Sequence, residues 1–163
     1  MEFRAMRRFR QQLSDAEAEE VLRRNTSGVL AVQGDNGYPY AVPLSYVYRD
    51  GRIRIHCART GHKIDAIRQN DRVSFCVIDQ DKIVPETLTT HFRSVIAFGC
   101  ARIVTDSAET DSALAELAKK YAPDLPEARV QAEIDRERAH TAIIEIQIEH
   151  LTGKEAIELR KKP

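Results

Sequence analysis

Residues 27–57 read SGVLAVQGDNGYPYAVPLSYVYRDGRIRIHC, and this stretch decides the fold. It contains two turn signals, GDNG at 34–37 and RDGR at 49–52, each flanked by β-branched or aromatic residues. Asn-Gly and Asp-Gly pairs adopt the positive φ angles that tight hairpin turns require. The pattern therefore predicts three antiparallel strands in succession. Their expected ranges are about 27–33, 38–49 and 52–57.

The segments on either side of this stretch predict further helices and strands. The S-x-x-E motif at 14–17 has the spacing of a capping box and predicts a helix over about 15–24. Thr60 is expected to cap a short helix at about 61–69, and Asn70 suits a left-handed position at its end. The remaining expected elements are a strand at 72–78, a loop or irregular crossover at 79–92, a strand at 93–104, a helix from Asp106 or Ser107 to about Tyr121, a helix from Pro126 to about Arg138, and a strand at 141–151. Six strands joined mostly by hairpins, with helices in two later connections, predict a mainly β fold: a small antiparallel barrel with helical additions.

The composition bounds the class of protein. The chain has 163 residues and a mass of 18.5 kDa, with 25 Lys+Arg against 25 Asp+Glu. A formal net charge of zero gives no general attraction to nucleic acid or to anionic membranes. Apolar runs are four residues or fewer, as at 29–32, so we expect no transmembrane helix, no secretory signal and a cytoplasmic protein. The expected organisation is a flexible basic arm at 1–13, a single domain at 14–154 and a C-terminal tail at 155–163.

Residue spacing argues against several kinds of cofactor site. The seven glycines never fall into G-x-G-x-x-G or G-x-x-x-x-G-K-[ST] spacing, which argues against a Rossmann dehydrogenase and a P-loop NTPase. The odd set of cysteines, Cys57, Cys76 and Cys100, indicates buried thiols in a reducing compartment. We expect no metal site at His56, Cys57 and His62, because neighbours on a strand point to opposite faces and a closed zinc site needs four ligands.

Two positions break local rules and are therefore candidate binding residues. Lys63 lies in the first turn of the short helix, beside Arg59, although a helix N-terminus carries a partial positive charge. A bound phosphate would make these cations favourable; without one they are simply solvated. Pro43 lies inside the 38–49 strand, where proline cannot donate a ladder hydrogen bond. That strand is therefore bulged, an ordinary edge strand, or open toward a flat heterocycle lying against 42–45.

Short segments spread from about 25 to 154 carry a distinctive order and spacing. They are GVL at 28–30, GYPY at 37–40, VPLSY at 42–46, HCA at 56–58, GHKID at 61–65, VPE at 84–86, RSVI at 93–96 with FG at 98–99, and LTGK at 151–154. In this order they resemble the flavin-binding split-barrel proteins related to pyridoxamine 5′-phosphate oxidase. The resemblance is strongest to the branch of 5-nitroimidazole resistance (Nim-like) proteins.

The resemblance implies a six-stranded split β-barrel that forms a homodimer, with FMN bound in a groove at the subunit interface. In that family a basic residue matching Lys63 holds the phosphate, with help from the positions of Arg59 and Thr60. The histidine near the flavin matches His62, which we expect to act as a proton donor to the substrate. The positions expected to line the isoalloxazine ring and the neighbouring strand wall are Val42, Pro43, Leu44, Ser45, Tyr46, His56, Cys57 and Ala58. Arg93 and Ser94 are expected to contribute from one of the two chains.

The implied activity is an FMN-dependent oxidoreductase that reduces small electrophilic compounds such as nitroaromatics, with NAD(P)H as a candidate electron donor. True pyridoxamine-phosphate oxidases end in an Arg-x-x-x-His-Asp-like substrate-binding stretch, whereas this chain reads TGKEAIELR at 152–160. Oxidation of vitamin B6 is therefore not expected. The alternatives are a non-catalytic flavin-binding redox protein and a haem- or F420-binding protein, because relatives with this fold bind those groups.

Overall fold

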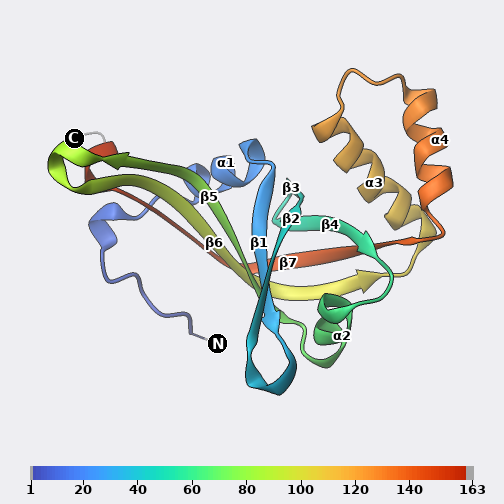
Figure 1. The fold of residues 1–163 in the computed structure, drawn as a ribbon, viewed down its shortest axis with the longest axis horizontal. Coiled ribbons are helices and arrows are strands. Elements are labelled where there is room, and N and C mark those ends of the chain that lie inside the picture. Colours follow the sequence, from blue (N-terminus) through green and yellow to red (C-terminus); the bar gives the residue numbers. More distant parts are fainter. Residues whose placement is uncertain (1, 161–163) are drawn as a thin grey trace.

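The hairpin turns of the 27–57 stretch form where the sequence predicts them. Asn36, Gly37, Asp50 and Gly51 all have positive φ angles, as tight turns require. The computed structural model describes residues 2–160. Its helices and strands, labelled in Figure 1, are α1 (Asp15–Arg24), β1 (Ser27–Gln33), β2 (Pro39–Ser45), β3 (Val47–Arg49), β4 (Arg52–Ala58), α2 (His62–Gln69), β5 (Arg72–Val84), β6 (Thr89–Val104), α3 (Ser107–Tyr121), α4 (Glu127–Glu137) and β7 (Thr141–Glu155). Short 3-10 turns lie at Phe9–Gln11, Asp35–Gly37, Pro85–Thr87 and Ile157–Leu159.

The strands form one antiparallel sheet in the order β2-β1-β5-β6-β7-β4-β3. The sheet has seven strands rather than the expected six, because the strand predicted at 38–49 is broken at Tyr46. The Tyr46 side chain is fully buried, and its Oη donates a 2.7 Å hydrogen bond to the Leu22 carbonyl. Because β2 and β3 meet at Tyr46 but lie at opposite ends of the strand order, the sheet has to curl until its ends approach each other. No ladder closes those ends within residues 2–160, so the fold is a split barrel.

Pro43 lies on an edge strand. Within residues 2–160, β2 pairs only with β1, and Pro43 is opposite Val29 in an unbroken register. Proline is tolerated there because one side of an edge strand has no ladder partner. The edge-strand interpretation of Pro43 is therefore confirmed, and the bulge is excluded for this ladder.

Two predictions about the boundaries of α2 are wrong. The N-cap is Gly61, without a side-chain capping bond, rather than Thr60. Gly61 adopts a φ of 125°, which a glycine tolerates, so the chain enters the helix one residue later than a Thr60 cap would require. Asn70 is extended (φ −149°, ψ 113°) rather than left-handed. Its side-chain oxygen accepts a hydrogen bond from the Arg72 amide and so guides the chain into β5.

The segment expected to be a loop at 79–92 forms most of a long hairpin instead. β5 and β6 continue to pair as far as Val84 opposite Thr89. Pro85 interrupts neither strand, because it opens the turn at the tip, where Leu88 has a φ of 51°. The hairpin projects from the barrel beside the C-terminal end of β7 (Figure 1).

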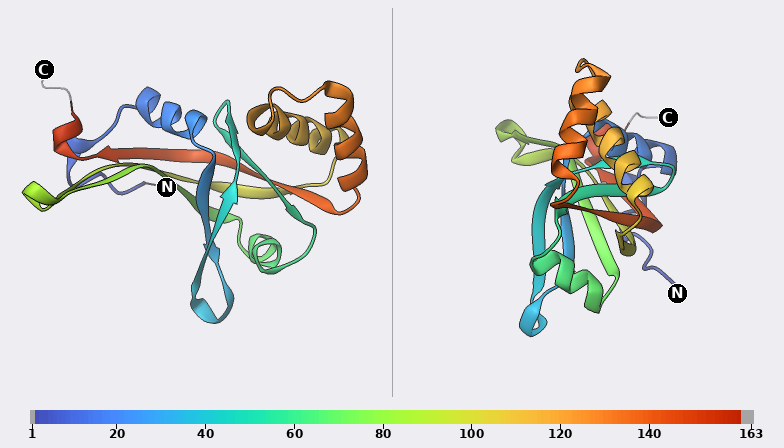
Figure 2. Two further views of the ribbon diagram at one scale, coloured as in Figure 1. Left: turned by 45° about the horizontal axis from the view of Figure 1, so that its top comes forward. Right: turned by 90° about the vertical axis from the view of Figure 1, so that its right-hand side faces the viewer.

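Two hydrophobic cores lie on opposite faces of the sheet. The main core fills the barrel and includes the α1 residues Ala18, Val21 and Leu22. A smaller core lies between α3 and the outer face of the sheet. Neighbours on β7 show the division, since Ile143 belongs to the smaller core and Ile144 to the main one. Figure 2 shows α3 and α4 on one side of the sheet and α2 on the other.

The helix starts follow their sequence signals. Ser14 and Glu17 form the predicted capping box of α1, and Asp106 caps α3 through the Glu109 amide. Just before α1, Leu13 is buried against Gly153 of β7. No helix in the described part of the chain has both the length and the apolar character that crossing a membrane requires.

Candidate functional site

The first turn of α2 presents a cation and free amides at an open surface. Lys63 is half-buried and forms no ion pair with a carboxylate of residues 2–160. The amides of Ile64 and Asp65 both donate to the Gly61 carbonyl, at 2.9 and 3.1 Å, whereas those of His62 and Lys63 precede this bonding pattern. A Cβ at Gly61 would meet no atom within 4 Å. A helix start with these properties can bind an anion.

His62 is held against the β1–β2 hairpin. Its ring stacks on Tyr40 of β2, with ring centroids 4.2 Å apart. Its Nε2 lies 3.7 Å from Oδ2 of Asp35, in the turn between β1 and β2, and its side chain is 37% exposed. An accessible imidazole near a carboxylate can hold a proton and give it up.

The predicted ring-lining residues divide between the two faces of β2 and β4. Val42, Leu44 and Cys57 are half-buried and pack against the main core. Burial raises the pKa of the Cys57 thiol, although the charge of Lys63 acts in the opposite direction. Cys57 is therefore a neutral packing group, and its electrostatic interaction places Lys63 close to β4.

Ser45 and His56, on the other face, meet at a cavity of about 660 Å³. This cavity lies between the sheet and the α3–α4 hairpin. The sequence analysis did not identify its helical wall, which is mainly apolar and includes Leu114, Leu117, Ala118, Leu125, Val130 and Ile134. The available signal was the pair Val130 and Ile134, which places two apolar side chains on one face of an otherwise polar helix. A cavity of this volume is typical of small-molecule sites.

The last turn of α3 clamps the point where β2 passes into β3. Tyr121 Oη accepts a 2.9 Å hydrogen bond from the Tyr46 amide and donates to the Thr26 carbonyl. Lys120 Nζ donates to the Tyr46 carbonyl at 3.2 Å and lies 4.3 Å from the centroid of the Tyr46 ring. Burial lowers the pKa of Lys120. The clamp fixes the position of Ser45, the residue immediately before Tyr46.

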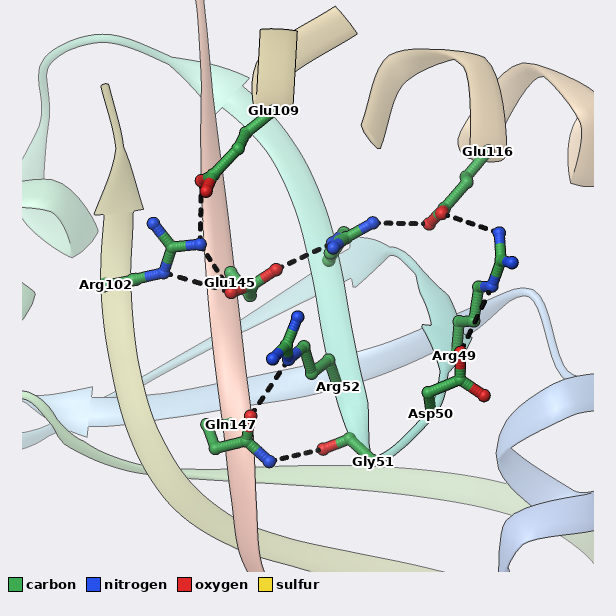
Figure 3. Close-up of polar contacts among 10 residues, drawn as sticks. Arg49, Asp50, Gly51, Arg52, Arg102, Glu109, Glu116, Glu145 and Gln147 are labelled. Carbon is green, nitrogen blue, oxygen red and sulfur yellow. Dashed lines mark hydrogen bonds and ion pairs between the residues drawn. The ribbon is translucent and has the colours of Figure 1, made fainter. Parts of the chain in front are cut away.

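A ladder of alternating charges ties α3 to the same face of the sheet (Figure 3). Glu145 of β7 is 5% exposed and accepts hydrogen bonds from Arg54 of β4 at 2.8 Å and from Arg102 of β6 at 2.7 Å. Glu116 of α3 accepts from Arg54 at 2.9 Å and from Arg49 at 3.1 Å. Burial opposes the ionisation of Glu145, but the two arginines outweigh it and lower the pKa of its carboxyl group. Ion pairs therefore hold the helical wall of the cavity in place, in addition to the packing of the smaller core.

A family model described as pyridoxamine 5′-phosphate oxidase matches residues 14–155, from the cap of α1 to the last residue of β7. The chain belongs to the pyridoxamine 5′-phosphate oxidase family. The resemblance inferred from the short sequence segments is thus confirmed at the level of the family. Curated protein sequences gave no significant match.

Solved structures support the split-barrel fold of this family member. A candidate 5-nitroimidazole antibiotic resistance protein from Bacteroides thetaiotaomicron is similar with a TM-score of 0.71 and 19% identity, over 88% of this chain and 85% of that one. A conserved hypothetical protein from Mycobacterium tuberculosis has a TM-score of 0.80 and 19% identity, over 98% and 96%. An FAD-binding protein from Mesorhizobium loti has a TM-score of 0.61 and 28% identity, over 90% and 97%. The first two similarities concern the fold alone.

The fold of this pyridoxamine 5′-phosphate oxidase family member separates the predicted site residues into two distant groups. Ala58 pairs with Thr141 at the start of β7, whereas Arg93 pairs with Glu155 at its end. The strand from 141 to 155 spans about 45 Å at roughly 3.3 Å per residue. Arg93 and Ser94 of one chain therefore do not reach the α2 N-terminus of that chain.

Several predicted ligands already have protein partners. The Arg93 guanidinium donates to carboxylates on β5 and β7, at 3.2 and 2.8 Å. Arg59 donates to two backbone carbonyls near the α4–β7 junction, at 3.1 and 3.3 Å. The Tyr46 side chain is enclosed in the main core. Ala58 and Thr60 are exposed beside the start of α2. The residues that the structure leaves available for a ligand are thus centred on α2 and on the facing parts of β2 and β4.

Proposed function

We propose that this protein is an FMN-binding oxidoreductase that reduces small electrophilic compounds, and that the flavin lies at the split of the barrel in a homodimer. The observation that carries the proposal is the half-buried, unpaired Lys63, which lies close to Cys57 of β4 at the open N-terminus of α2. Family membership and the similarity to the FAD-binding protein from Mesorhizobium loti support a flavin as the ligand.

The start of α2 fits the phosphate of such a cofactor. It offers donors that form no hydrogen bond within residues 2–160: the His62 and Lys63 amides, Lys63 Nζ and the exposed Thr60 hydroxyl. The open surface at Gly61 allows a phosphate to approach the backbone. Because Arg59 is committed to backbone carbonyls, Lys63 is the principal cation of the proposed phosphate site.

The neighbouring strands fit a flat heterocyclic ring. β2 has a ladder partner on one side only, and Pro43 removes one backbone donor from this edge strand. Val42 and Leu44 provide half-buried apolar surface on one face of β2, and Ser45 provides a hydroxyl on the other. We assign the ring to the free edge of β2, across the split from His56.

When bound, the flavin supplies the hydride chemistry of the reaction, and NAD(P)H is the proposed source of its electrons. This chain binds the cofactor, covers one face of the ring and provides a proton. Reduction of a nitro group consumes protons as well as electrons, and Nε2 of His62 is the proposed donor. The Tyr40 ring fixes the plane of the imidazole, and Oδ2 of Asp35 lies 3.7 Å from its Nε2.

A second copy of the chain would complete the site. The β5–β6 hairpin exposes Ile78, Ile83 and Leu88 by 63%, 72% and 93%, and apolar side chains exposed together mark association surfaces. Arg93 and Ser94 lie on the same hairpin, far from the α2 site of their own chain. We therefore assign the hairpin to the homodimer interface, where these two residues would approach the flavin of the partner.

A titration with FMN tests the phosphate assignment. Lys63→Ala is expected to weaken FMN binding at least tenfold, which corresponds to about 1.4 kcal/mol. Lys119→Ala removes an exposed lysine from α3 and is the matched control, with an affinity expected to stay within about twofold of wild type. Equal affinities of Lys63→Ala and wild type would remove the basis of the proposal.

The absorbance spectrum of the freshly purified protein distinguishes the cofactors that this fold can hold. We expect the two flavin bands in the near-UV and blue. An intense Soret band would indicate haem, and a deazaflavin spectrum would indicate F420. If the FMN-loaded protein reduces no nitro compound with NADH or NADPH, the reductase activity is refuted, and a non-catalytic flavin-binding protein is left.

A further inference from the structure

Most of the residues that line the cavity under the α3–α4 hairpin are not part of the proposed flavin site. It is enclosed by the end of β2, by β4, by the start of β7 and by both helices. The proposed phosphate site lies at α2, on the opposite side of the sheet from these helices (Figure 2). The cavity therefore adds a second space to the site, next to the strands assigned to the ring.

The helical wall of this cavity is mainly apolar, and the protein leaves part of it exposed. Val130 and Ile134 lie one turn apart on the same face of α4, and both line the cavity. Leu125 and Tyr121 line it too and are 46% and 40% exposed. Apolar side chains gathered around a hollow favour a ligand that removes them from water.

The side of the cavity formed by the sheet is polar but carries no permanent charge. Ser45, His56 and Thr141 come from three different strands, and none of their side chains forms a hydrogen bond with another residue of 2–160. Arg129, Glu133 and Glu137 of α4 also line the cavity at exposed positions, and the two carboxylates pair with Arg136. The cavity thus places neutral hydrogen-bonding groups on the sheet opposite an apolar helical wall, with charged side chains at exposed positions along α4.

We infer that this cavity is the substrate site and that it takes a compact, mostly apolar molecule with one polar group directed at Ser45, His56 and Thr141. The inference rests on the proposed function, because a molecule held there would lie against the same two strands that flank the flavin ring.

The α3–α4 hairpin is accordingly the element that selects the substrate by size. It is anchored at both ends: Tyr121 and Lys120 bind the β2–β3 junction, and Arg138 forms a 2.8 Å ion pair with Asp111. Anchors of this kind keep the wall in place when the cavity is empty. Substitutions on the wall should therefore change ligand size preference without changing the fold.

The matched variants Ala118→Trp and Ala115→Trp test the inference with an uncharged apolar fluorophore, N-phenyl-1-naphthylamine. Ala118 lines the cavity, whereas Ala115 is exposed on the same helix. We expect saturable fluorescence enhancement with wild type, at least a tenfold loss of affinity with Ala118→Trp, and an affinity within about twofold of wild type with Ala115→Trp. Val130→Trp fills the cavity from α4 and replaces Ala118→Trp if that variant does not fold.

Separate FMN titrations on the same proteins distinguish failure of this inference from failure of the proposed function. Absence of saturable probe binding, or equal probe affinity in wild type and both cavity variants, refutes the cavity as a ligand site. Stoichiometric displacement of the probe by FMN also refutes it as a substrate site, because the cavity would then belong to the cofactor. If the probe binds as expected but FMN does not bind, the flavin proposal fails and the cavity is a ligand site of another function.

Discussion

The carboxylate of Glu145 is the centre of the charge ladder in Figure 3, and replacing it tests how firmly the cavity wall is held. Glu145→Gln keeps the size of the side chain and removes its charge. The amide can still accept one hydrogen bond, but its NH₂ group would face a guanidinium that also only donates. One of the two arginine contacts, to Arg54 or to Arg102, is therefore lost.

The expected cost follows from the exposure of the partners. The Arg54 side chain is 20% exposed and that of Arg102 is 51% exposed. Removing one partner of a buried ion pair costs about 3–5 kcal/mol, but Arg54 keeps Glu116 and Arg102 keeps Glu109. Exposed pairs contribute only about 0–1 kcal/mol. We therefore expect Glu145→Gln to lower the free energy of unfolding by about 2 kcal/mol at pH 7.

The pH dependence of this difference has a definite sign. The pKa of Glu145 is lower in the folded protein than its ordinary value of 4.5. A carboxyl group of this kind stabilises the fold fully above its unfolded pKa, and this contribution is lost as the pH falls through the folded pKa. The gap between wild type and Glu145→Gln should stay constant from pH 7 to about 5.5 and close at more acidic pH.

Urea unfolding followed by far-UV circular dichroism measures both quantities. Glu149→Gln is the control, because Glu149 lies on the same strand but is exposed and pairs with Arg72 at 3.3 Å. Its cost should stay below about 0.5 kcal/mol. A Glu145→Gln protein as stable as wild type, or a stability gap that widens toward acid, would contradict the structural argument.

Three further predictions concern the clamp, the helix start and the buried thiol. Tyr121→Phe removes the hydroxyl that accepts the Tyr46 amide and should cost about 1–2 kcal/mol in urea unfolding; an unchanged stability would show that the clamp is not needed. Gly61→Ala places a Cβ on a φ of 125° and a ψ of 169° and should cost about 1–3 kcal/mol, with weaker FMN binding in a titration. Burial raises the pKa of Cys57, so iodoacetamide at pH 8 should modify it more slowly in the folded protein than in urea, and equal rates would be evidence against its burial.

The features that could be predicted from the sequence depend on neighbouring residues. Positive φ angles at Asn36 and Gly37 follow from the small set of residues that accept them, and the Ser14 cap follows from its spacing to Glu17. Lys63 was identified because its charge conflicts with the helix start at which it lies. In each case the interaction spans fewer than about five residues, so the sequence contains the whole of the physical cause.

The features that could not be predicted depend on residues far apart in the sequence. The hairpin at 79–92 forms because two polar strands pair with each other, and a polar segment alone looks like a loop. The cavity exists because α3 and α4 lie over β4, and nothing in the pattern of Val130 or Ile134 specifies the strand that they face. The distance between Arg93 and α2 could not be predicted for the same reason, since it depends on the length and register of β7.

Tyr46 shows why the fold and the candidate site have a common origin. In an uninterrupted strand at 38–49, β2 and β3 would be collinear, and the sheet would have no reason to curl. Burial of the Tyr46 ring, with its Oη bound to the Leu22 carbonyl, breaks the strand and brings the two ends of the sheet together. The same break leaves β2 with a free edge, and the Tyr121 clamp on its backbone holds Ser45 at the cavity. The interactions that form the split are thus the ones that position the candidate ligand-binding residues. A substitution that makes the strand continuous at this point should abolish the proposed site even if the β1–β2 hairpin survives.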